Sequence, residues 1–357
     1  MASAPLLTVA VAMYQSADTI AHLLESVLSQ ASDEIDVLIV DDGSTDQSVA
    51  VAESVATRGA AVRVIKHASN LGLGPARNTA IAEAKGRYVM FVDSDDEVLP
   101  GALSAITERL ESSELDIMFI GTVEHKRGRD APLHDPSALA RLAGASEPWS
   151  LSSHPELLFF PPSTWSKIFR RDFLRDHHIE FPSGYHQDLP SSTEALLRAE
   201  RIGGLDYLCY RYIRRGEGSS ATRSKGTKTL VRVDQIKRIR ERTDISSLPR
   251  NVQEHLVASV AMHLIWGNRA AYRTLPENLH EELFQRSSTE LKWWLDVARP
   301  GPTVSSEPLM PTSEREKFTR SLEGGDFTSW QRVMARHARG LRWKRRFSPS
   351  RYRLFKG

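Results

Sequence analysis

Short apolar segments that run directly into clusters of acidic residues constrain the fold of this chain more than any other feature. Asp36–Val40 is followed by Asp41–Asp46, and Tyr88–Val92 is followed by Asp93–Asp96. The same periodicity predicts further strands at Leu7–Ala12, Val62–Lys66 and Asp116–Ile120, and helices at Ala17–Gln30 and from Asp46 to Ala56. Alternating strands and helices predict a mainly parallel α/β sheet, covered on both faces. Acidic residues that end such strands lie at the rim where open α/β sheets bind ligands.

Composition and charge exclude several classes of protein. The 357 residues are 40% hydrophobic and 26% charged, which is typical of a globular chain and allows roughly two domains. Cys209 is the single cysteine, so an internal disulfide and a thiolate metal cluster are excluded. No apolar run reaches the ~18 residues that cross a bilayer. We therefore expect a cytoplasmic protein, with peripheral attachment to the inner face of the membrane as an open alternative.

The second half of the chain follows a different pattern. Gly121–His154 is polar and predicts loops, after which a helix is expected at Ser191–Ala199 and a strand at Leu205–Tyr212. Only helical periodicity follows, at Leu230–Arg242, Val252–Tyr272, Glu277–Val297, Ser313–Leu322 and Phe327–Arg346. We therefore predict an α/β domain over residues 1–222 and an all-helical domain over 223–357. The last residues, 332–357, hold ten Lys and Arg and no acidic residue.

The acidic turn Asp93–Asp96 has two interpretations by itself: a Mg²⁺ or Mn²⁺ site completed by substrate phosphates, or a cap for the next helix. The second acidic turn favours a ligand-binding rim, where Asp41 and Asp42 could accept hydrogen bonds from a nucleobase or ribose. Tyr14 follows the first strand and offers a ring for base stacking. Asn70–Asn78 contains glycines before a helix, but it matches neither the dinucleotide fingerprint nor the phosphate loop of NTPases.

These motifs, in this order and spacing, closely resemble family-2 glycosyltransferases of the GT-A fold. The resemblance rests on Val9–Gln15, Val40–Asp46, Asn70–Asn78 and Phe91–Asp96, continues through Trp165–Arg171, and fades after about Thr222. It implies a GT-A, Rossmann-like domain that transfers a sugar with inversion from a nucleotide sugar, usually UDP-linked, to an acceptor hydroxyl. The expected enzyme is a hexosyl- or N-acetylhexosaminyltransferase acting on a cell-surface polysaccharide, a teichoic-acid-like polymer or a lipid-linked precursor.

The resemblance also implies roles for individual residues. Tyr14 and Asp42 would contact the base, with Asp41 and Asn70 in the same pocket, and Arg77 would hold that pocket together. Asp93 would contact the ribose and, with Asp95, the Mn²⁺ or Mg²⁺ on the diphosphate. Arg214, Arg215 or Ser219 would close over the diphosphate; a solvent-exposed basic turn is the alternative interpretation of this segment. Asp188, which follows Gln187 where the family commonly has Glu, would be the general base; a helix cap is the alternative interpretation.

Two other functions remain open from the sequence. A nucleotidyltransferase on a similar scaffold would need a basic phosphate-binding loop after the first strand, and Ala10–Asp18 has neither a basic residue nor a glycine. A non-catalytic scaffold would not require Asp42, Asp93, Asp95 and Asp188. Residues 327–357 alternate apolar and basic side chains, which suits an anionic membrane surface as well as it suits packing on the helical domain. Nucleic acid is the less favoured partner of this tail.

Overall fold

The computed structural model describes residues 4–56, 62–134, 147–215, 227, 230–298 and 312–338. The chain divides into two compact units: Met1–Ser150 with Pro162–Glu217, and Leu151–Pro161 with Gly218–Gly357. The boundary expected between residues 222 and 223 lies outside the described residues. The short segment Leu151–Pro161 groups with the helical unit, although the sequence predicts one continuous domain there.

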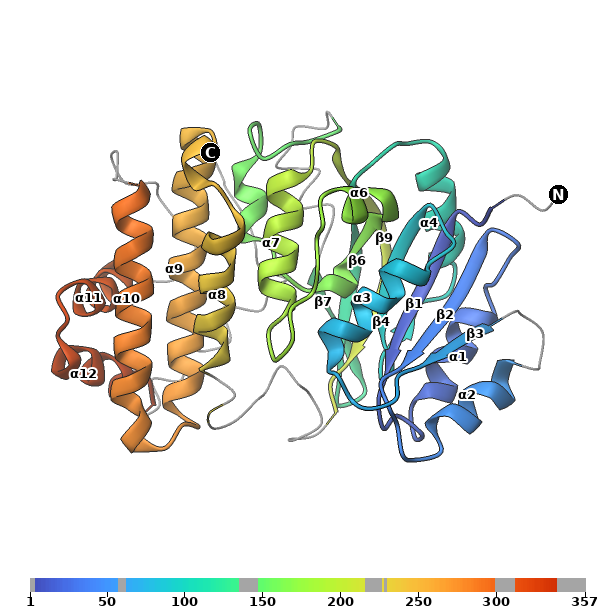
Figure 1. Cartoon of the computed structure of the whole chain (residues 1–357), viewed down its shortest axis with the longest axis horizontal. Coiled ribbons are helices and arrows are strands. Elements are labelled where there is room, and N and C mark those ends of the chain that lie inside the picture. The colour runs from blue at the N-terminus through green and yellow to red at the C-terminus, as the bar shows by residue number, and fades with distance from the viewer. Residues whose placement is uncertain are drawn as a thin grey trace. The chain divides into compact units, whose positions relative to one another are not determined.

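The first half of the sheet has the predicted parallel architecture (Figure 1). Its strands are β1 (Leu7–Met13), β2 (Ile35–Asp41), β3 (Val62–Lys66) and β4 (Tyr88–Asp93), in the order β3-β2-β1-β4. The helices in the connections are α1 (Ile20–Leu28), α2 (Ser48–Ala56) and α3 (Leu73–Glu83). Apolar side chains along β1, β2 and β4 are buried because helices pack on the sheet, as expected from their continuous apolar sequence. The register pairs Met13 with Asp41 and Ala12 with Asp93, so the carboxyl ends of these strands meet at one rim.

The second half of the sheet is mixed in direction. It continues through β8 (Lys167–Arg170), β6 (Ile117–Lys126), β9 (Ile202–Ile213) and β5 (Glu97–Val98), and β7 (Arg129–His134) pairs with β6. β8 is antiparallel to both β4 and β6, whereas β6 and β9 are parallel. The helices of this half are α4 (Ala102–Glu111), α6 (Arg171–Asp176) and α7 (Asp188–Arg198), with a short 3-10 turn, η2, at Thr164–Ser166.

One sequence-based expectation is wrong in this half. The start of the segment predicted as loops forms the end of β6 and all of β7, joined as an antiparallel hairpin. Arg127 and Gly128 occupy the connection with φ values of 52° and 73°. Two successive residues with positive φ match the twist of a tight hairpin, which a polar sequence with one glycine does not reveal.

The second unit is helical, as predicted. It contains η1 (Pro155–Phe159), α8 (Val231–Arg242), η5 (Ile245–Ser247), α9 (Arg250–Tyr272), η6 (Glu277–Leu279), α10 (His280–Ala298), α11 (Thr312–Glu323) and α12 (Phe327–Ala338). Trp294 of α10 is fully buried in the core of this unit, and Trp293 is partly buried. On α12, Trp330 and Met334 are also buried, so its apolar face packs inside this unit. No helix in the described part of the chain is both long and apolar enough to span a membrane.

Candidate active site

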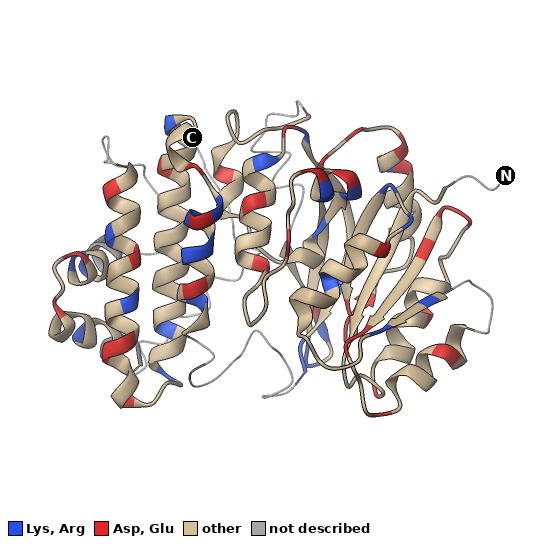
Figure 2. Ribbon diagram, viewed as in Figure 1, with Lys and Arg blue, Asp and Glu red and all other residues tan. Residues whose placement is uncertain are grey.

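Acidic residues gather in the loops beyond the carboxyl ends of β1, β2 and β4 (Figure 2). The hydroxyls of Ser16 and Ser94 lie 2.7 Å apart and join the loop after β1 to the turn after β4. Tyr14, at the end of β1, is 46% exposed, which leaves ring surface available for stacking. The structure therefore brings the predicted rim residues of three separate strands into one place.

Arg77 is the centre of this rim. It lies on α3, is only 3% exposed, and donates from Nη2 to Asp93 Oδ1 at 2.8 Å. From Nη1 it donates to Gln187 Oε1 at 3.2 Å and makes a longer bond of 3.4 Å to Thr164 Oγ1. Its Nε is buried with no hydrogen-bond partner among the described residues. One buried guanidinium thus links the acidic turn after β4 to the residue beside Asp188.

The acidic turn Asp93–Asp96 is held by β9 and the residues after it. The Tyr210 hydroxyl accepts from the Asp93 amide at 3.1 Å and donates to Asp96 Oδ2 at 2.6 Å. Burial and the charges of Asp93 and Asp95 raise the pKa of Asp96 well above its ordinary value. Asp95 is more open and forms an ion pair of 2.9 Å with Arg215. Burial, followed by the charge of Asp93, raises the pKa of the Asp95 carboxyl in spite of that arginine.

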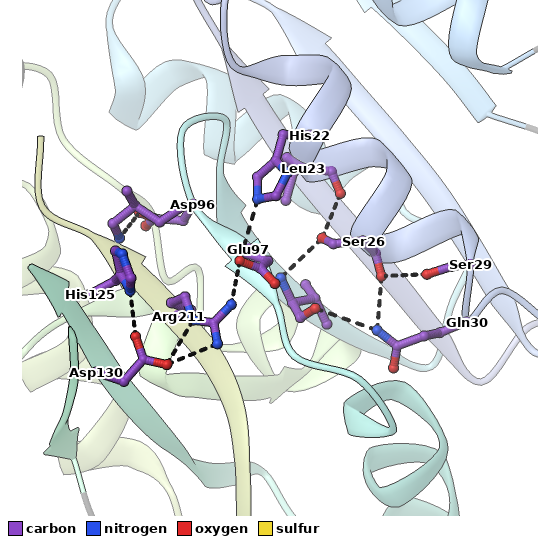
Figure 3. Close-up of polar contacts among 12 residues, drawn as sticks. His22, Leu23, Ser26, Ser29, Gln30, Asp96, Glu97, His125, Asp130 and Arg211 are labelled. Atoms are coloured by element: carbon purple, nitrogen blue, oxygen red, sulfur yellow. Dashed lines mark hydrogen bonds and ion pairs between the residues drawn. The ribbon is translucent and has the colours of Figure 1, made fainter. Parts of the chain in front are cut away.

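A chain of ion pairs supports the strand that follows this turn (Figure 3). Arg211 on β9 pairs with Glu97 at 2.7 Å and with Asp130 at 2.9 Å. His22 of α1 contacts Glu97 at 3.3 Å, and His125 of β6 contacts Asp130 at 2.6 Å. The short strand β5 is therefore fixed between α1 and the β6–β7 hairpin, which limits the movement of the acidic turn before it.

Asp42 holds the glycine-containing loop. Its Oδ1 accepts from the Leu71 amide at 2.9 Å, and its Oδ2 accepts from the Gly72 amide at 2.7 Å. His67 Nδ1 lies 2.8 Å from the same carboxylate. These contacts make Asp42 the anchor of the loop before α3, and its expected contact with a nucleobase stays a prediction.

Asp188 is the first residue of α7 and is half-buried. The two residues before it are constrained: His186 has a positive φ of 60°, and Gln187 is 4% exposed and held by Arg77. A non-glycine residue with positive φ is uncommon and is found more often at functional sites. The backbone therefore presents Asp188 at a defined position next to the rim.

The structure places the remaining predicted residues as follows. Asp41 is buried and lies 3.3–3.4 Å from the Ser44 amide, whereas Asn70 is exposed at the loop before Leu71. Arg214 pairs with Glu124 of β6 at 2.7 Å, so Arg215 is the neighbouring basic residue that reaches Asp95. Ser219 lies outside the described residues. The Tyr210 hydroxyl is a site residue that the sequence did not predict. The only indication in the sequence is that Tyr210 lies near the end of a predicted strand.

The carboxylates of Asp93 and Asp95 suit a divalent cation that a bound ligand would also coordinate. Within the described residues, no group of three or more His, Cys, Asp and Glu side chains is arranged to hold a metal ion. Asp93 and Asp95 nevertheless offer hard oxygen donors, with 27% and 36% of their side chains exposed. Mg²⁺ is commonly held by one or two carboxylates together with substrate phosphates, and this donor set suits that arrangement.

Comparison with known proteins shows which family the first unit resembles. The sequence profile described as glycosyl transferase family 2 matches residues 8–171, which contain β1 to β4, Arg77 and the acidic turn. Over residues 8–171 the chain is therefore similar to glycosyl transferase family 2. The uncharacterized glycosyltransferase EpsJ of Bacillus subtilis is 33% identical over 212 residues, covering 58% of this chain and 61% of EpsJ. The succinoglycan biosynthesis protein ExoO of Rhizobium meliloti is 34% identical over 181 residues, covering 50% of this chain and 51% of ExoO.

A third relative has solved structures. The poly(ribitol-phosphate) β-N-acetylglucosaminyltransferase TarS of Staphylococcus aureus is 31% identical over 216 residues, covering 59% of this chain and 36% of TarS. The crystal structure of S. aureus TarS 1–349 in complex with UDP-GlcNAc superposes with a TM-score of 0.72 and 21% identity, covering 94% of this chain and 92% of that chain. This likeness confirms the GT-A type fold followed by a helical region. The matches to EpsJ and ExoO span only about half to two thirds of those relatives.

Proposed function

We propose that this protein is an inverting glycosyltransferase that moves a sugar from a UDP-linked donor to an acceptor hydroxyl. The observation that carries the proposal is Arg77, which bonds both to Asp93 in the acidic turn and to Gln187 beside Asp188. A single buried side chain thereby fixes the distance between a donor-binding rim and a candidate base. The match to the family over residues 8–171 and the UDP-GlcNAc complex of TarS support the nucleotide-sugar donor.

The site residues divide the reaction between the two ends of the sugar. Asp188 accepts the proton of the acceptor hydroxyl while the oxygen forms a bond to the anomeric carbon. On the opposite face the bond from that carbon to the phosphate oxygen breaks, and its electron pair leaves with the nucleoside diphosphate. One base and no carboxylate nucleophile are required for inversion.

The rim residues bind the donor. Tyr14 stacks against the base, Asp93 binds the ribose, and Asp42 keeps the Leu71–Gly72 loop in place. Asp95, with Asp93, would hold Mn²⁺ or Mg²⁺ at the diphosphate; when bound, such an ion stabilises the charge of the leaving group as a Lewis acid. Arg215 is paired with Asp95 at 2.9 Å and offsets part of the negative charge of the acidic turn.

The acceptor is proposed to be a cell-surface polymer or its lipid-linked precursor, and the transferred sugar a hexose or N-acetylhexosamine. The support comes from two relatives: ExoO is a succinoglycan biosynthesis protein, and TarS is a poly(ribitol-phosphate) β-N-acetylglucosaminyltransferase. Attachment to an anionic membrane is proposed for the basic tail alone. Because Trp330 and Met334 are buried in the helical unit, we limit that role to residues 339–357, which lie outside the described residues.

The test of the transferase proposal measures UDP release from a panel of UDP-sugars with Mn²⁺, with and without acceptor extracts. Asp188→Asn should bind donor normally by calorimetry and transfer at least ~10²-fold more slowly, the scale expected when a general base is lost. An exposed control, Asp33→Asn, should leave both quantities unchanged. Turnover of Asp188→Asn near that of the wild type would show that another residue is the base.

The tail is tested with vesicles. The full chain should co-sediment with anionic but not neutral liposomes, more weakly at high salt, and a protein ending at Ala338 should not. Equal sedimentation of both proteins would remove the membrane role.

A further inference from the structure

Lys167 is a fully buried lysine to which the proposed reaction assigns no role so far. It is the first residue of β8, and its side chain has no solvent exposure. Its Nζ donates to the Ser163 carbonyl at 3.0 Å and to Ser166 Oγ at 3.4 Å, and lies 5.1 Å from the centre of the Phe119 ring. A buried ammonium needs a compensating charge as well as hydrogen bonds, since burying an isolated charge is costly.

The segment that carries Lys167 lies along the beginning of α7. Ser192 donates from Oγ to the Pro162 carbonyl at 2.5 Å. Ser192 is one helical turn after Asp188, so the two side chains share a face of α7. Just before Asp188, Gln187 is tied through Arg77 to Thr164. Residues 162–167 therefore border the helix face on which Asp188 stands.

The electrostatics of Lys167 agree with this geometry. Burial lowers the pKa of Lys167 to about 7, and the charge of Asp188 acts in the opposite direction. The charge of Asp188 therefore favours the protonated ammonium, which agrees with the contacts that place residues 162–167 along the start of α7. The interaction works both ways, because a neighbouring positive charge favours the ionised form of a carboxylate.

We propose that Lys167 is the positioning residue of the candidate base, holding the Asp188 carboxylate ionised and directed toward the acceptor hydroxyl. The inference rests on the proposed function, in which Asp188 accepts the acceptor proton. Lys167 itself touches neither substrate nor reacting atoms in this scheme. It acts only through Asp188, and its own position is set by the Ser163 carbonyl at the start of η2.

The competing explanation is that Lys167 only caps the turn Ser163–Ser166. Lys167→Gln separates the two, because a glutamine amide donates to the Ser163 carbonyl but carries no charge. Lys167→Gln should lower kcat by about 10²-fold, the scale of a misplaced catalytic group, with donor affinity unchanged. Lys167→Arg, which keeps the charge, should recover part of the lost kcat. A matched control is Arg170→Met on the same strand, which breaks the 2.7 Å ion pair with Asp116 and should lower stability without changing kcat.

A double-mutant cycle with Asp188→Asn decides the matter. If Lys167 acts through Asp188, adding Lys167→Gln to Asp188→Asn changes kcat by less than ~2-fold, because coupled residues are not additive. The proposal would be overturned if the double variant lost kcat by the product of the two single losses. It would also be overturned if Lys167→Gln alone left kcat unchanged. Unchanged kcat in Asp188→Asn alone would instead remove Asp188 as the base, so failure of the proposed function is recognised separately.

Discussion

Replacing Asp42 by alanine tests whether this residue anchors a loop or contacts a ligand. The substitution removes the acceptor of the Leu71 and Gly72 amides, which lie 2.9 and 2.7 Å from its two oxygens. It also removes the partner of His67 at 2.8 Å. The Asp42 side chain is only 4% exposed, so water replaces these bonds incompletely.

The magnitude follows from the two amide bonds. A hydrogen bond to a charged acceptor contributes about 1.5–3 kcal/mol, so losing both should lower the free energy of unfolding of the first unit by at least about 3 kcal/mol. For a unit of roughly 200 residues this corresponds to a fall in Tm of about 6–12 °C. Asp42→Asn should lower the free energy of unfolding somewhat less, because its single amide oxygen can still accept a hydrogen bond from one of the two N–H groups.

Hydrogen exchange provides the local assay and Asp41→Asn the matched control. In Asp42→Ala the amides of Leu71 and Gly72 should exchange much faster, whereas the amides of β1 should change only with global stability. Asp41 is equally buried, but among the described residues its carboxylate has only the longer contacts of 3.3–3.4 Å to the Ser44 amide. Its substitution should therefore change stability by less than about 1 kcal/mol. Wild-type Tm and exchange in Asp42→Ala, together with loss of donor binding, would refute the anchoring role.

Three further outcomes follow from the structure. Asp95→Asn should abolish Mn²⁺-dependent UDP release, since the amide loses the charge that attracts the cation; full activity of this variant in EDTA would contradict the metal assignment. Gly74→Ala should lower stability by about 1–3 kcal/mol in urea unfolding, because the added Cβ would lie 2.1 Å from the Pro182 carbonyl oxygen; an unchanged midpoint would contradict this. The pKa of Asp36 is lowered, because burial raises it but the bonds to Arg63 and Thr8 lower it by more. Its ionised carboxylate therefore stabilises the fold above the unfolded-state pKa of ~4, and this stabilisation is lost as the pH falls below that value. The free energy of unfolding should thus fall less between neutral and acidic pH for Asp36→Asn than for the wild type. Equal falls in the two proteins would refute the assignment.

The sequence alone determined the parallel half of the sheet and the helical second unit. The signals for both are local. The continuous apolar runs of β1, β2 and β4 and the 3.6-residue periodicity of α8–α10 can each be recognised within about ten to twenty consecutive residues. The acidic turns were recognisable for the same reason, since each follows its own strand directly. The predicted rim required only that neighbouring parallel strands end together, and the pairing of Met13 with Asp41 and of Ala12 with Asp93 shows that they do.

Tertiary structure alone decided which side chains act on one another. The contact of Arg77 with Gln187 joins residues 110 positions apart, and that of Tyr210 with Asp96 joins residues 114 apart. Such pairs leave no periodic trace in a sequence, because they are set by strand order in the mixed half of the sheet. The choice of Arg215 over Arg214 as the partner of Asp95 likewise depends on which way each side chain leaves the strand end. Tertiary packing, and not local sequence, buries Lys167, because its low-dielectric surroundings exist only once the segment before β8 lies along α7.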